Sequence, residues 1–267
     1  IGRKMGAALL LDYQSRFNFG SRTGIDLPNE SSGAIYTLDQ MKDMELASTT
    51  FGQGFTSTMI QEISAVSAVI NGGTYYQPHV VKEIKSQEDG SVLKTNEGNV
   101  LKQIVSSDVS EKIREYMGMS VTSGTSRKSK VQGYSMGGKT GTAEILSTKE
   151  KDYLVSFIGF APLDTPQVVV YVVVDRPNVE EQADSSYAQY IAQAILDEIL
   201  PYMNIYPDEE TEETTKLWDG FKGVLKLDDS EVEVDEPAVQ TEGSETGTDN
   251  APDIEVVQDE SGSSEEY

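Results

Sequence analysis

Apolar residues recur at helical spacing in two long segments of the chain, residues 56–71 and 185–203. In each segment they fall on one side of a helix, which predicts two helices packed against a core. The apolar face of the first helix is formed by Ile60, Ile63, Val66, Val69 and Ile70. The apolar face of the second helix is formed by Tyr187, Ile191, Ala194, Ile195, Ile199 and Leu200.

A third helix and a group of short strands are predicted between these two segments. Asp108, followed three residues later by Glu111, forms a capping box for this helix, which ends before Gly124. The strand candidates are residues 80–84, 91–94 and 100–105. Turn-forming sequences that contain glycine separate them, so we expect a small β region.

Three further strand candidates follow in succession, at residues 135–146, 153–161 and 167–175. The last two are apolar at consecutive positions, so their sheet needs helices on both faces. The connections are too short to hold a crossover helix, and the strands must therefore be antiparallel neighbours. The predicted fold class is α/β, with an antiparallel sheet covered by helices.

Negative charge is concentrated at the C-terminal end of the chain. The 267 residues carry a formal net charge of -24, and residues 207–267, with 21 acidic and 3 basic residues, contribute most of it. This segment is too polar to bury enough apolar surface to offset the loss of chain entropy. We therefore predict a folded part, residues 1–206, and a disordered acidic tail, residues 207–267, that is dispensable for chemistry. The apolar stretch from Leu217 to Leu225 is either a docking motif or a transient hydrophobic cluster.

The composition argues against several kinds of site. The absence of cysteine excludes disulfides and thiolate groups, and the single histidine, His79, is interpreted as structural, so we expect no metal and no cofactor. The negative charge disfavours nucleic acid and anionic lipid as partners. No apolar run reaches the ~18 residues that a membrane span needs. The chain starts at Ile1 with residues that read as the middle of a helix, so we treat it as a fragment.

The candidate chemistry lies at the start of the first sheet strand, in the sequence Gly137-Gly138-Lys139-Thr140-Gly141-Thr142-Ala143-Glu144. Glycines allow a ligand to approach the backbone closely. Lys139 and Thr142 can supply a cation and a donor for a carboxylate, and the unpaired groups of an edge strand can pair with an extended peptide. Taken alone, a Lys-Thr-Gly triplet more commonly reflects a solvated lysine.

Three other stretches accompany this motif, Arg22–Pro28, Phe51–Gly54 and Asn71–His79. Together they make residues 1–206 resemble the class B penicillin-binding proteins, the monofunctional peptidoglycan transpeptidases of the division and sporulation type. The resemblance implies the penicillin-binding transpeptidase fold, shared with serine β-lactamases and incomplete here at its N-terminus. In that family the motifs Ser-x-x-Lys, which holds the nucleophile, and Ser-x-Asn precede the part matched here. Neither occurs in a matching context, so we assign no nucleophile in this chain.

The activity that the resemblance implies is acyl transfer. A serine attacks a D-alanyl-D-alanine stem peptide of peptidoglycan, forms an acyl-enzyme, and passes the acyl group to an amine on a neighbouring strand; β-lactam antibiotics acylate the same serine. The resemblance places the protein at the extracytoplasmic face of the bacterial membrane, on an anchor outside this sequence, with other cell-wall or division proteins as partners. This fragment alone is expected to be inactive.

The resemblance also implies a role for each motif residue. Lys139 binds the terminal carboxylate of the substrate, and Thr140 and Thr142 present hydroxyl groups beside it. The backbone N–H of Thr142 is a donor of the oxyanion hole. Gly141 leaves room for the substrate to approach.

Glu144, Gln53 and Thr125 are weaker candidates for substrate binding. Glu144 follows the motif directly, and a strand-edge carboxylate that faces water explains it equally well. Gln53 and Thr125 occupy loops that the family places near the cleft, and ordinary hydrogen bonding within a loop explains them as well.

Two other functions are open on this sequence. The chain can belong to a non-catalytic scaffold protein at the cell surface, with a degenerate transpeptidase fold. It can also belong to a β-lactamase or a β-lactam sensor, although the stretches around Arg22 and Phe51 favour the transpeptidase. Ser-x-Asn and Ser-x-x-Lys motifs in the sequence before Ile1 would favour the enzyme, and their absence would favour the scaffold.

Overall fold

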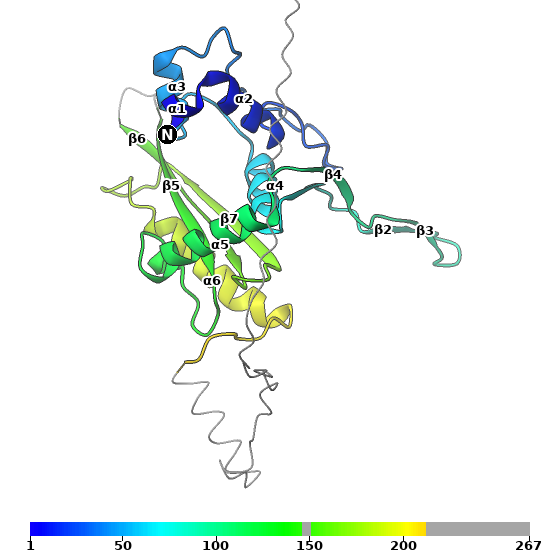
Figure 1. Cartoon of the computed structure of the whole chain (residues 1–267). Coiled ribbons are helices and arrows are strands. Elements are labelled where there is room, and N and C mark those ends of the chain that lie inside the picture. Colours follow the sequence, from blue (N-terminus) through cyan, green and yellow to red (C-terminus); the bar gives the residue numbers. More distant parts are fainter. Residues whose placement is uncertain (146–150, 212–267) are drawn as a thin grey trace, which may run out of the picture. The chain divides into compact units, whose positions relative to one another are not determined.

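The computed structural model describes residues 1–145 and 151–211 (Figure 1). The helices are α1 (Gly2–Met5), α2 (Ala7–Arg16), α3 (Asp43–Thr49), α4 (Met59–Ile70), α5 (Ser107–Thr122), the short 3-10 helix η1 (Arg127–Ser129) and α6 (Ser186–Tyr202). The strands are β1 (Thr74–Gln77), β2 (Glu83–Lys85), β3 (Val92–Thr95), β4 (Asn99–Gln103), β5 (Gly137–Ile145), β6 (Asp152–Ala161) and β7 (Val168–Asp175). Most of the predicted tail, including the stretch from Leu217 to Leu225, lies outside the described residues.

Strands β5, β6 and β7 form one antiparallel sheet in that order, which confirms the predicted fold class. Helix α6 packs on one face of the sheet, where Ala188 and Ala192 join a buried cluster with Phe157. Helix α4 packs against β7 on the other face, where Glu62 is close enough to Tyr171 to raise the pKa of its hydroxyl further than burial alone does. Helices therefore cover both faces, as strands that are apolar at consecutive positions require.

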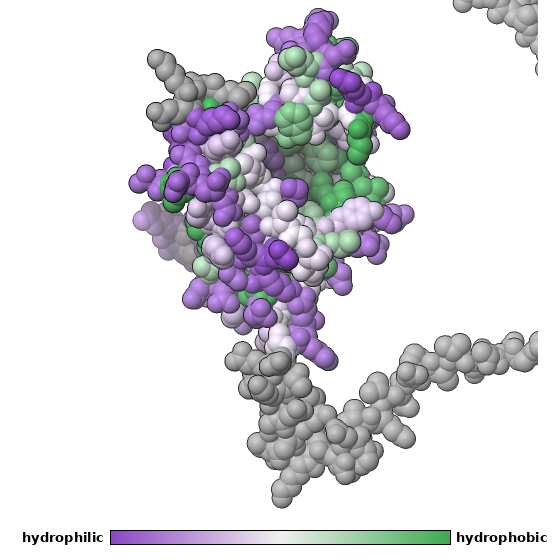
Figure 2. Space-filling model, turned by 90° about the vertical axis from the view of Figure 1, so that its left-hand side faces the viewer, coloured by the Kyte–Doolittle hydropathy of each residue, from purple (hydrophilic) through white to green (hydrophobic). Residues whose placement is uncertain are grey.

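One side of the described chain is hollowed (Figure 2). Apolar residues gather inside the hollow and along one flank of it, and polar residues surround them. Contiguous exposed apolar surface of this kind marks a place where protein or ligand is bound.

The buried side of α6 differs from the predicted one. It is formed by Ala188, Ala192, Leu196 and Leu200, which lie four residues apart and have no exposed surface. Ile191, which the sequence pattern placed on the core face, is 44% exposed. Small side chains let a helix approach its neighbour closely. The helix therefore turns its alanine and leucine stripe, and not its isoleucine stripe, towards the strands.

The buried side of α4 also differs from the prediction. Ile70 is the only one of the five predicted core residues that is fully buried; the other four are half-buried. The buried stripe contains Gln61, Ala65 and Ala68 instead. The polar side chain at the N-terminal end of this stripe needs partners for its groups.

Gln61 finds these partners in the loop that follows α2. Its Nε2 donates to the carbonyl oxygens of Asn18 at 3.3 Å, Ser21 at 2.7 Å and Ser32 at 2.8 Å. Its Oε1 accepts the N–H of Thr58 at 2.8 Å, and Thr58 Oγ1 accepts the N–H of Gln61 at 3.3 Å. This reciprocal pair is a capping box at the start of α4. The single amide thus ties residues 18–32 to the helix.

The predicted start of α5 is wrong by two residues. Ser106, and not Asp108, caps the helix, because Ser106 Oγ accepts the N–H of Val109 at 3.3 Å. Asp108 lies in the first turn, where its carboxylate still favours the positive end of the helix dipole. Glu111 plays no part in the cap.

The small β region forms two separate two-stranded sheets. Strands β2 and β3 pair as a hairpin, which extends away from the rest of the described chain in Figure 1. Strand β4 pairs with β1, a strand that the sequence pattern did not predict.

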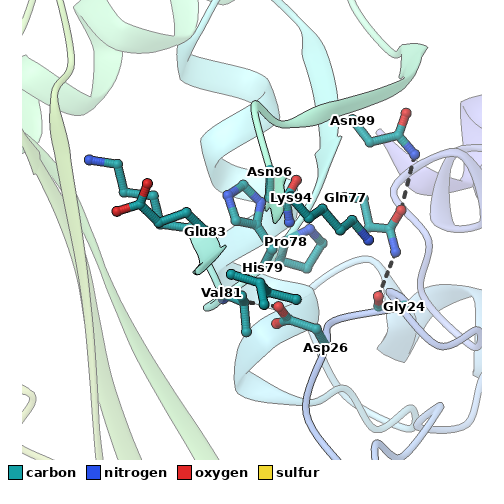
Figure 3. A pocket seen from close by; sticks show the side chains of 12 residues that line it. Gly24, Asp26, Gln77, Pro78, His79, Val81, Glu83, Lys94, Asn96 and Asn99 are labelled. Atoms are coloured by element: carbon teal, nitrogen blue, oxygen red, sulfur yellow. Dashed lines mark hydrogen bonds between the residues drawn. The ribbon is translucent and has the colours of Figure 1, made fainter. Parts of the chain in front are cut away.

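A pocket of about 370 Å³ lies at the base of this hairpin (Figure 3). Asp26 lines it and accepts hydrogen bonds from the N–H groups of Val80 at 2.7 Å and Val81 at 2.9 Å, which lower the pKa of the Asp26 carboxyl group. Gln77 Nε2 donates to the carbonyl oxygen of Gly24 at 2.6 Å. These contacts join two of the stretches that carry the family resemblance.

Glu30 binds Thr23 and Gly24 within the loop that follows α2. Its Oε1 accepts the N–H of Thr23 at 2.5 Å and the hydroxyl of Thr23 at 2.6 Å, and its Oε2 accepts the N–H of Gly24 at 3.0 Å. Burial alone would raise the pKa of the Glu30 carboxyl group. The hydrogen bonds from Thr23 and Gly24 together outweigh burial, so the pKa lies below its usual value of 4.5.

We expect the contribution of Glu30 to stability to depend on pH. Because the pKa is lowered by folding, the carboxylate stabilises the folded protein at neutral pH, and this stabilisation is lost as the pH falls below 4.5 through the folded-state pKa. Glu30→Gln should therefore lower the melting temperature at pH 7, and the difference from wild type should shrink as the solution is acidified. Glu88→Gln is the matched control, since its carboxylate has no hydrogen bond or ion pair among the described contacts. A difference between Glu30→Gln and wild type that stays constant with pH would contradict this account.

Candidate active site

The Lys-Thr-Gly motif lies on β5, one of the two edge strands of the described sheet. Lys139 pairs with Ile158 of β6, and Thr140 pairs with Phe157. Because cross-strand partners share a face and successive residues alternate, Lys139 and Gly141 face the side on which α4 packs. Thr140 and Thr142 face the side on which α6 packs. The motif therefore presents its cation and its hydroxyl groups on opposite faces of the edge strand.

The glycines of the motif are required by the neighbouring strand. A Cβ atom on Gly137 would lie 2.3 Å from the ring of Phe160, and one on Gly138 would lie 2.5 Å from the ring of Phe157. A Cβ atom on Gly141 would lie 2.5 Å from Ser156 Oγ. These distances are far below van der Waals contact. Cross-strand packing thus gives a reason for Gly137 and Gly138 that is independent of any substrate, whereas the Ser156 hydroxyl can rotate away from a side chain at position 141.

The Lys139 side chain is exposed, and its Nζ donates to the carbonyl oxygen of Thr140 at 2.5 Å. Within residues 1–145 and 151–211 it has no carboxylate partner within 4.0 Å. An ammonium group has three N–H donors. Two of them can therefore bind an anionic group that approaches the edge of the sheet.

The two threonines connect the motif strand to loops on the α6 side. Thr140 Oγ1 lies 3.3 Å from Thr125 Oγ1, which brings the loop after α5 to the strand. Thr142 Oγ1 donates to the carbonyl oxygen of Ala183 at 3.4 Å, just before α6. Thr125, predicted from the sequence as a weaker candidate, thus contacts the motif directly.

The loop before α6 is held by a charged group beside this contact. Asp184 Oδ1 accepts the N–H of Ser186 at 2.9 Å and also its hydroxyl. Lys128 Nζ donates to Ser186 Oγ at 2.8 Å and lies 4.0 Å from Asp184 Oδ2. The hydrogen bonds from Ser186, and then the charge of Lys128, lower the pKa of the Asp184 carboxyl group. The carboxylate therefore fixes the loop in its charged form.

A pocket of about 450 Å³ brings together three of the predicted residues, Gln53, Thr142 and Glu144. Gln53 enters it from the loop after α3, between two glycines with positive φ, Gly52 at 90° and Gly54 at 89°. Such backbone angles favour glycine, which explains the Phe-Gly-Gln-Gly sequence. Lys139, Thr140, Gly141 and Thr125 do not line this pocket.

Three further residues line the same pocket and were not predicted, Ser48, Phe51 and Tyr153. Phe51 belongs to the Phe-Gly-Gln-Gly stretch, and the residue is 74% exposed, which is unusual for a large aromatic residue. Tyr153 pairs with Glu144 across β5 and β6, so the antiparallel register of the hairpin could have identified it. Ser48 precedes the loop and carries no signal in the sequence.

The letters Ser-x-x-Lys occur once in the chain, from Ser91 to Lys94. Ser91 adjoins β3, and its hydroxyl donates to Asp89 Oδ1 at 2.7 Å in the hairpin turn. Residues three apart on a strand point to opposite faces, whereas on a helix they share one. This serine and lysine therefore cannot act together as a nucleophile and its base. Within the described residues there is also no cluster of three or more acidic or histidine side chains that could hold a metal ion, and no helix there is long and apolar enough to cross a membrane.

Comparisons with known proteins agree with this architecture. Residues 1–197 match the family described as the penicillin binding protein transpeptidase domain. The chain is 38% identical over 227 residues to stage V sporulation protein D of Bacillus subtilis. The aligned region covers 84% of this chain and 35% of that protein. It is 30% identical over 196 residues to the peptidoglycan D,D-transpeptidase MrdA of Acinetobacter baumannii. The aligned region covers 65% of this chain and 29% of that protein.

A solved structure shows the same fold. Penicillin-binding protein 3 of Mycobacterium tuberculosis, in complex with ampicillin, superposes with a TM-score of 0.69 at 26% identity, covering 79% of this chain and 49% of that chain. The chain thus spans about a third of the length of the two curated relatives and about half of the solved one. On the match over residues 1–197, the motif and the fold, this chain belongs to the penicillin-binding protein transpeptidase family.

Proposed function

We propose that this chain forms one wall of the catalytic cleft of a peptidoglycan D,D-transpeptidase that cross-links stem peptides through a serine acyl-enzyme. The observation that carries the proposal is the placement of the motif on an exposed edge strand, with Thr142, Glu144 and Gln53 around one pocket beside it. The Acinetobacter relative is a peptidoglycan D,D-transpeptidase, which supports the same reaction. The ampicillin complex of the Mycobacterium relative supports β-lactams as ligands.

Each motif residue has a role in this proposal. Lys139 binds the terminal carboxylate of the stem peptide or the carboxylate of a β-lactam, since its ammonium group is exposed and has free donors. The backbone N–H of Thr142 stabilises the oxyanion of the tetrahedral intermediate, where one such donor is typically worth ~10² to 10³ in rate. Thr140 and Thr142 hold the loops that flank the strand. Glu144 and Gln53 contact the substrate beyond the reacting bond.

The nucleophilic serine, in this proposal, comes from residues that precede Ile1 in a longer protein. The relatives are about three times as long as the matched region, which leaves room for it. The apolar hollow in Figure 2 supports the proposal as well, because such a surface suits a further packed element. The active protein acts at the extracytoplasmic face of the membrane, where its substrate lies.

Labelling with a fluorescent penicillin tests the proposal. Residues 1–267 alone should form no covalent adduct, because the proposed nucleophile lies outside them. The protein extended through the residues before Ile1 should be labelled, and excess ampicillin should prevent the labelling. A stable adduct on residues 1–267 alone would show that the nucleophile lies within this chain. A well-folded extended protein that takes up no penicillin would favour the non-catalytic scaffold.

A further inference from the structure

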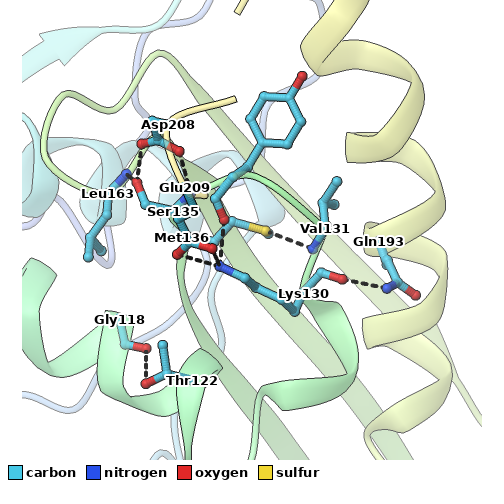
Figure 4. A network of polar contacts seen from close by, with 11 residues as sticks. Gly118, Thr122, Lys130, Val131, Ser135, Met136, Leu163, Gln193, Asp208 and Glu209 are labelled. Carbon is cyan, nitrogen blue, oxygen red and sulfur yellow. Dashed lines mark hydrogen bonds and ion pairs between the residues drawn. The ribbon is translucent and has the colours of Figure 1, made fainter. Parts of the chain in front are cut away.

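The chain beyond α6 returns to the loop that leads into the motif strand (Figure 4). The N–H groups of Asp208 and Glu209 donate to the carbonyl oxygen of Gly133 at 2.9 and 3.0 Å. Tyr134 Oη donates to the carbonyl oxygen of Ile205 at 3.1 Å. Residues 205–209 therefore lie along residues 133–135 and are bound to them through backbone groups and the Tyr134 hydroxyl.

Asp208 binds Ser135, which lies two residues before the start of β5. Its Oδ1 accepts the N–H of Ser135 at 2.6 Å, and its Oδ2 accepts the Ser135 hydroxyl. Ser135 Oγ in turn accepts the N–H of Leu163 at 2.9 Å, just after the end of β6. Hydrogen bonds to a carboxylate are stronger than those between neutral groups. The carboxylate therefore links the start of β5 to the turn after its neighbouring strand.

Glu209 binds Lys130, at the other end of the loop that runs from Lys130 to Ser135. Lys130 Nζ donates to Glu209 Oε1 at 2.7 Å and lies 2.6 Å from Oε2, and it also donates to the carbonyl oxygen of Tyr134 at 2.6 Å. The Lys130 side chain is only 21% exposed, so its ammonium group needs these partners. Lys130 also anchors the loop to α6, since its carbonyl oxygen accepts from Gln193 Nε2 at 2.5 Å.

The chain enters β5 through the loop from Lys130 to Ser135. Ser135 stands four residues before Lys139, and the strand between them is held on one side only, by β6. At its start the strand is also packed, since Met136 is buried in a core cluster with Leu196 and Leu200, and the polar contacts of the loop add to this packing. The orientation of the motif thus depends on how firmly this loop is fixed.

We propose that Asp208 and Glu209 are positioning residues that hold the start of β5, and with it Lys139, in the orientation the cleft requires; this rests on the proposed transpeptidase function. They act through Ser135 and Lys130 and do not touch the substrate. The first residues of the predicted acidic tail therefore belong to the working part of the domain. The expectation that the tail is dispensable then applies only to residues beyond 211.

Two truncations of the complete protein test the inference. A protein that ends after Thr211 keeps the contacts of Asp208 and Glu209, and it should be acylated by penicillin as fast as the untruncated protein. A protein that ends after Tyr206 loses both residues but keeps Ile205, and it should be acylated ~10-fold more slowly, since small displacements of positioned groups have effects of this size or larger. Equal acylation rates for the two truncations would overturn the inference.

Point variants distinguish the effect of losing the hydrogen bonds of Asp208 from the effect of losing its negative charge. Asp208→Ala should slow acylation, whereas Asp208→Asn should retain most of the rate, because an amide can still accept from the Ser135 N–H and donate to its hydroxyl. Glu210→Gln removes the same charge from an exposed neighbour that has no hydrogen bond or ion pair among the described contacts, so it should have no effect. An Asp208→Asn variant as slow as Asp208→Ala would contradict the geometry.

Hydrogen exchange makes the test independent of catalysis. In Asp208→Ala, amide exchange should accelerate in residues 137–141 and stay unchanged in α4, which a general loss of stability would not produce. Unchanged exchange in residues 137–141, or acceleration of similar size throughout the domain, would overturn the positioning role. If the wild-type protein takes up no penicillin at all, the proposed function fails while the exchange experiment still decides the inference.

Discussion

Lys139→Ala should slow acylation of the complete protein by a penicillin by ~10- to 100-fold, because a hydrogen bond to a charged group is worth about 1.5 to 3 kcal/mol. The side chain is exposed at the edge of β5 and has free donors for a carboxylate. Its removal takes away little packing, so the melting temperature should stay close to that of the wild type. The measurement is the second-order rate constant of acylation for both proteins in one buffer.

Two further variants make this result specific. Lys139→Arg keeps the positive charge, but its planar guanidinium group places the donors differently, so it should restore only part of the rate. Lys94→Ala removes another exposed lysine from β3, on the hairpin, and should leave acylation unchanged. If Lys139→Ala is acylated at the wild-type rate, Lys139 is only a solvated strand residue and the assignment of the site is wrong.

Gln61→Leu should lower the free energy of unfolding by ~2 to 5 kcal/mol, since a buried polar group left without its partner costs about 1 to 3 kcal/mol. The leucine has a similar volume but cannot donate to the carbonyl oxygens of Ser21 and Ser32, which would lose this donor. It also cannot accept the N–H of Thr58, so the capping box of α4 is lost. Chemical denaturation followed by circular dichroism measures the change.

Gln14→Leu provides a matched control for this prediction. Gln14 is also a buried glutamine, on α2, but its Oε1 has no hydrogen-bond partner among the described residues. Replacing an unsatisfied polar group by an apolar one of similar size is nearly neutral or stabilising. Gln14→Leu should therefore be at least as stable as the wild type. If Gln61→Leu is no less stable than Gln14→Leu, the hydrogen bonds of Gln61 do not hold residues 18–32 to α4.

The sequence by itself determined the order of the elements from α4 to α6, apart from β1 and η1, together with the antiparallel sheet and the motif. Short connections exclude crossover helices, and consecutive apolar residues in β6 and β7 require cover on both faces, so these features follow from local spacing. The glycines and the lysine of residues 137–141 were recognisable as a motif for the same reason, because they are adjacent in the chain. The roles of its residues in catalysis stay predictions.

Tertiary structure decided which side of each helix is buried. Periodicity identifies an amphipathic helix, but it cannot show that a close approach to the sheet selects Ala188 and Ala192 over Ile191. Nor can it show that three carbonyl oxygens of a distant loop make Gln61 a core residue. Both choices depend on groups far apart in the sequence.

Tertiary structure also decided the surroundings of the motif. Gln53 and Thr142 meet in one pocket only because the loop after α3 folds over the end of the β5–β6 hairpin. Asp208 and Glu209 look in the sequence like the start of a solvated acidic tail, since charge runs are ordinarily exposed. They are bound instead, because Ser135 and Lys130 present donors that only the folded loop brings to them. Local spacing fixes local structure, whereas the partners of a polar side chain are fixed by the path of the whole chain.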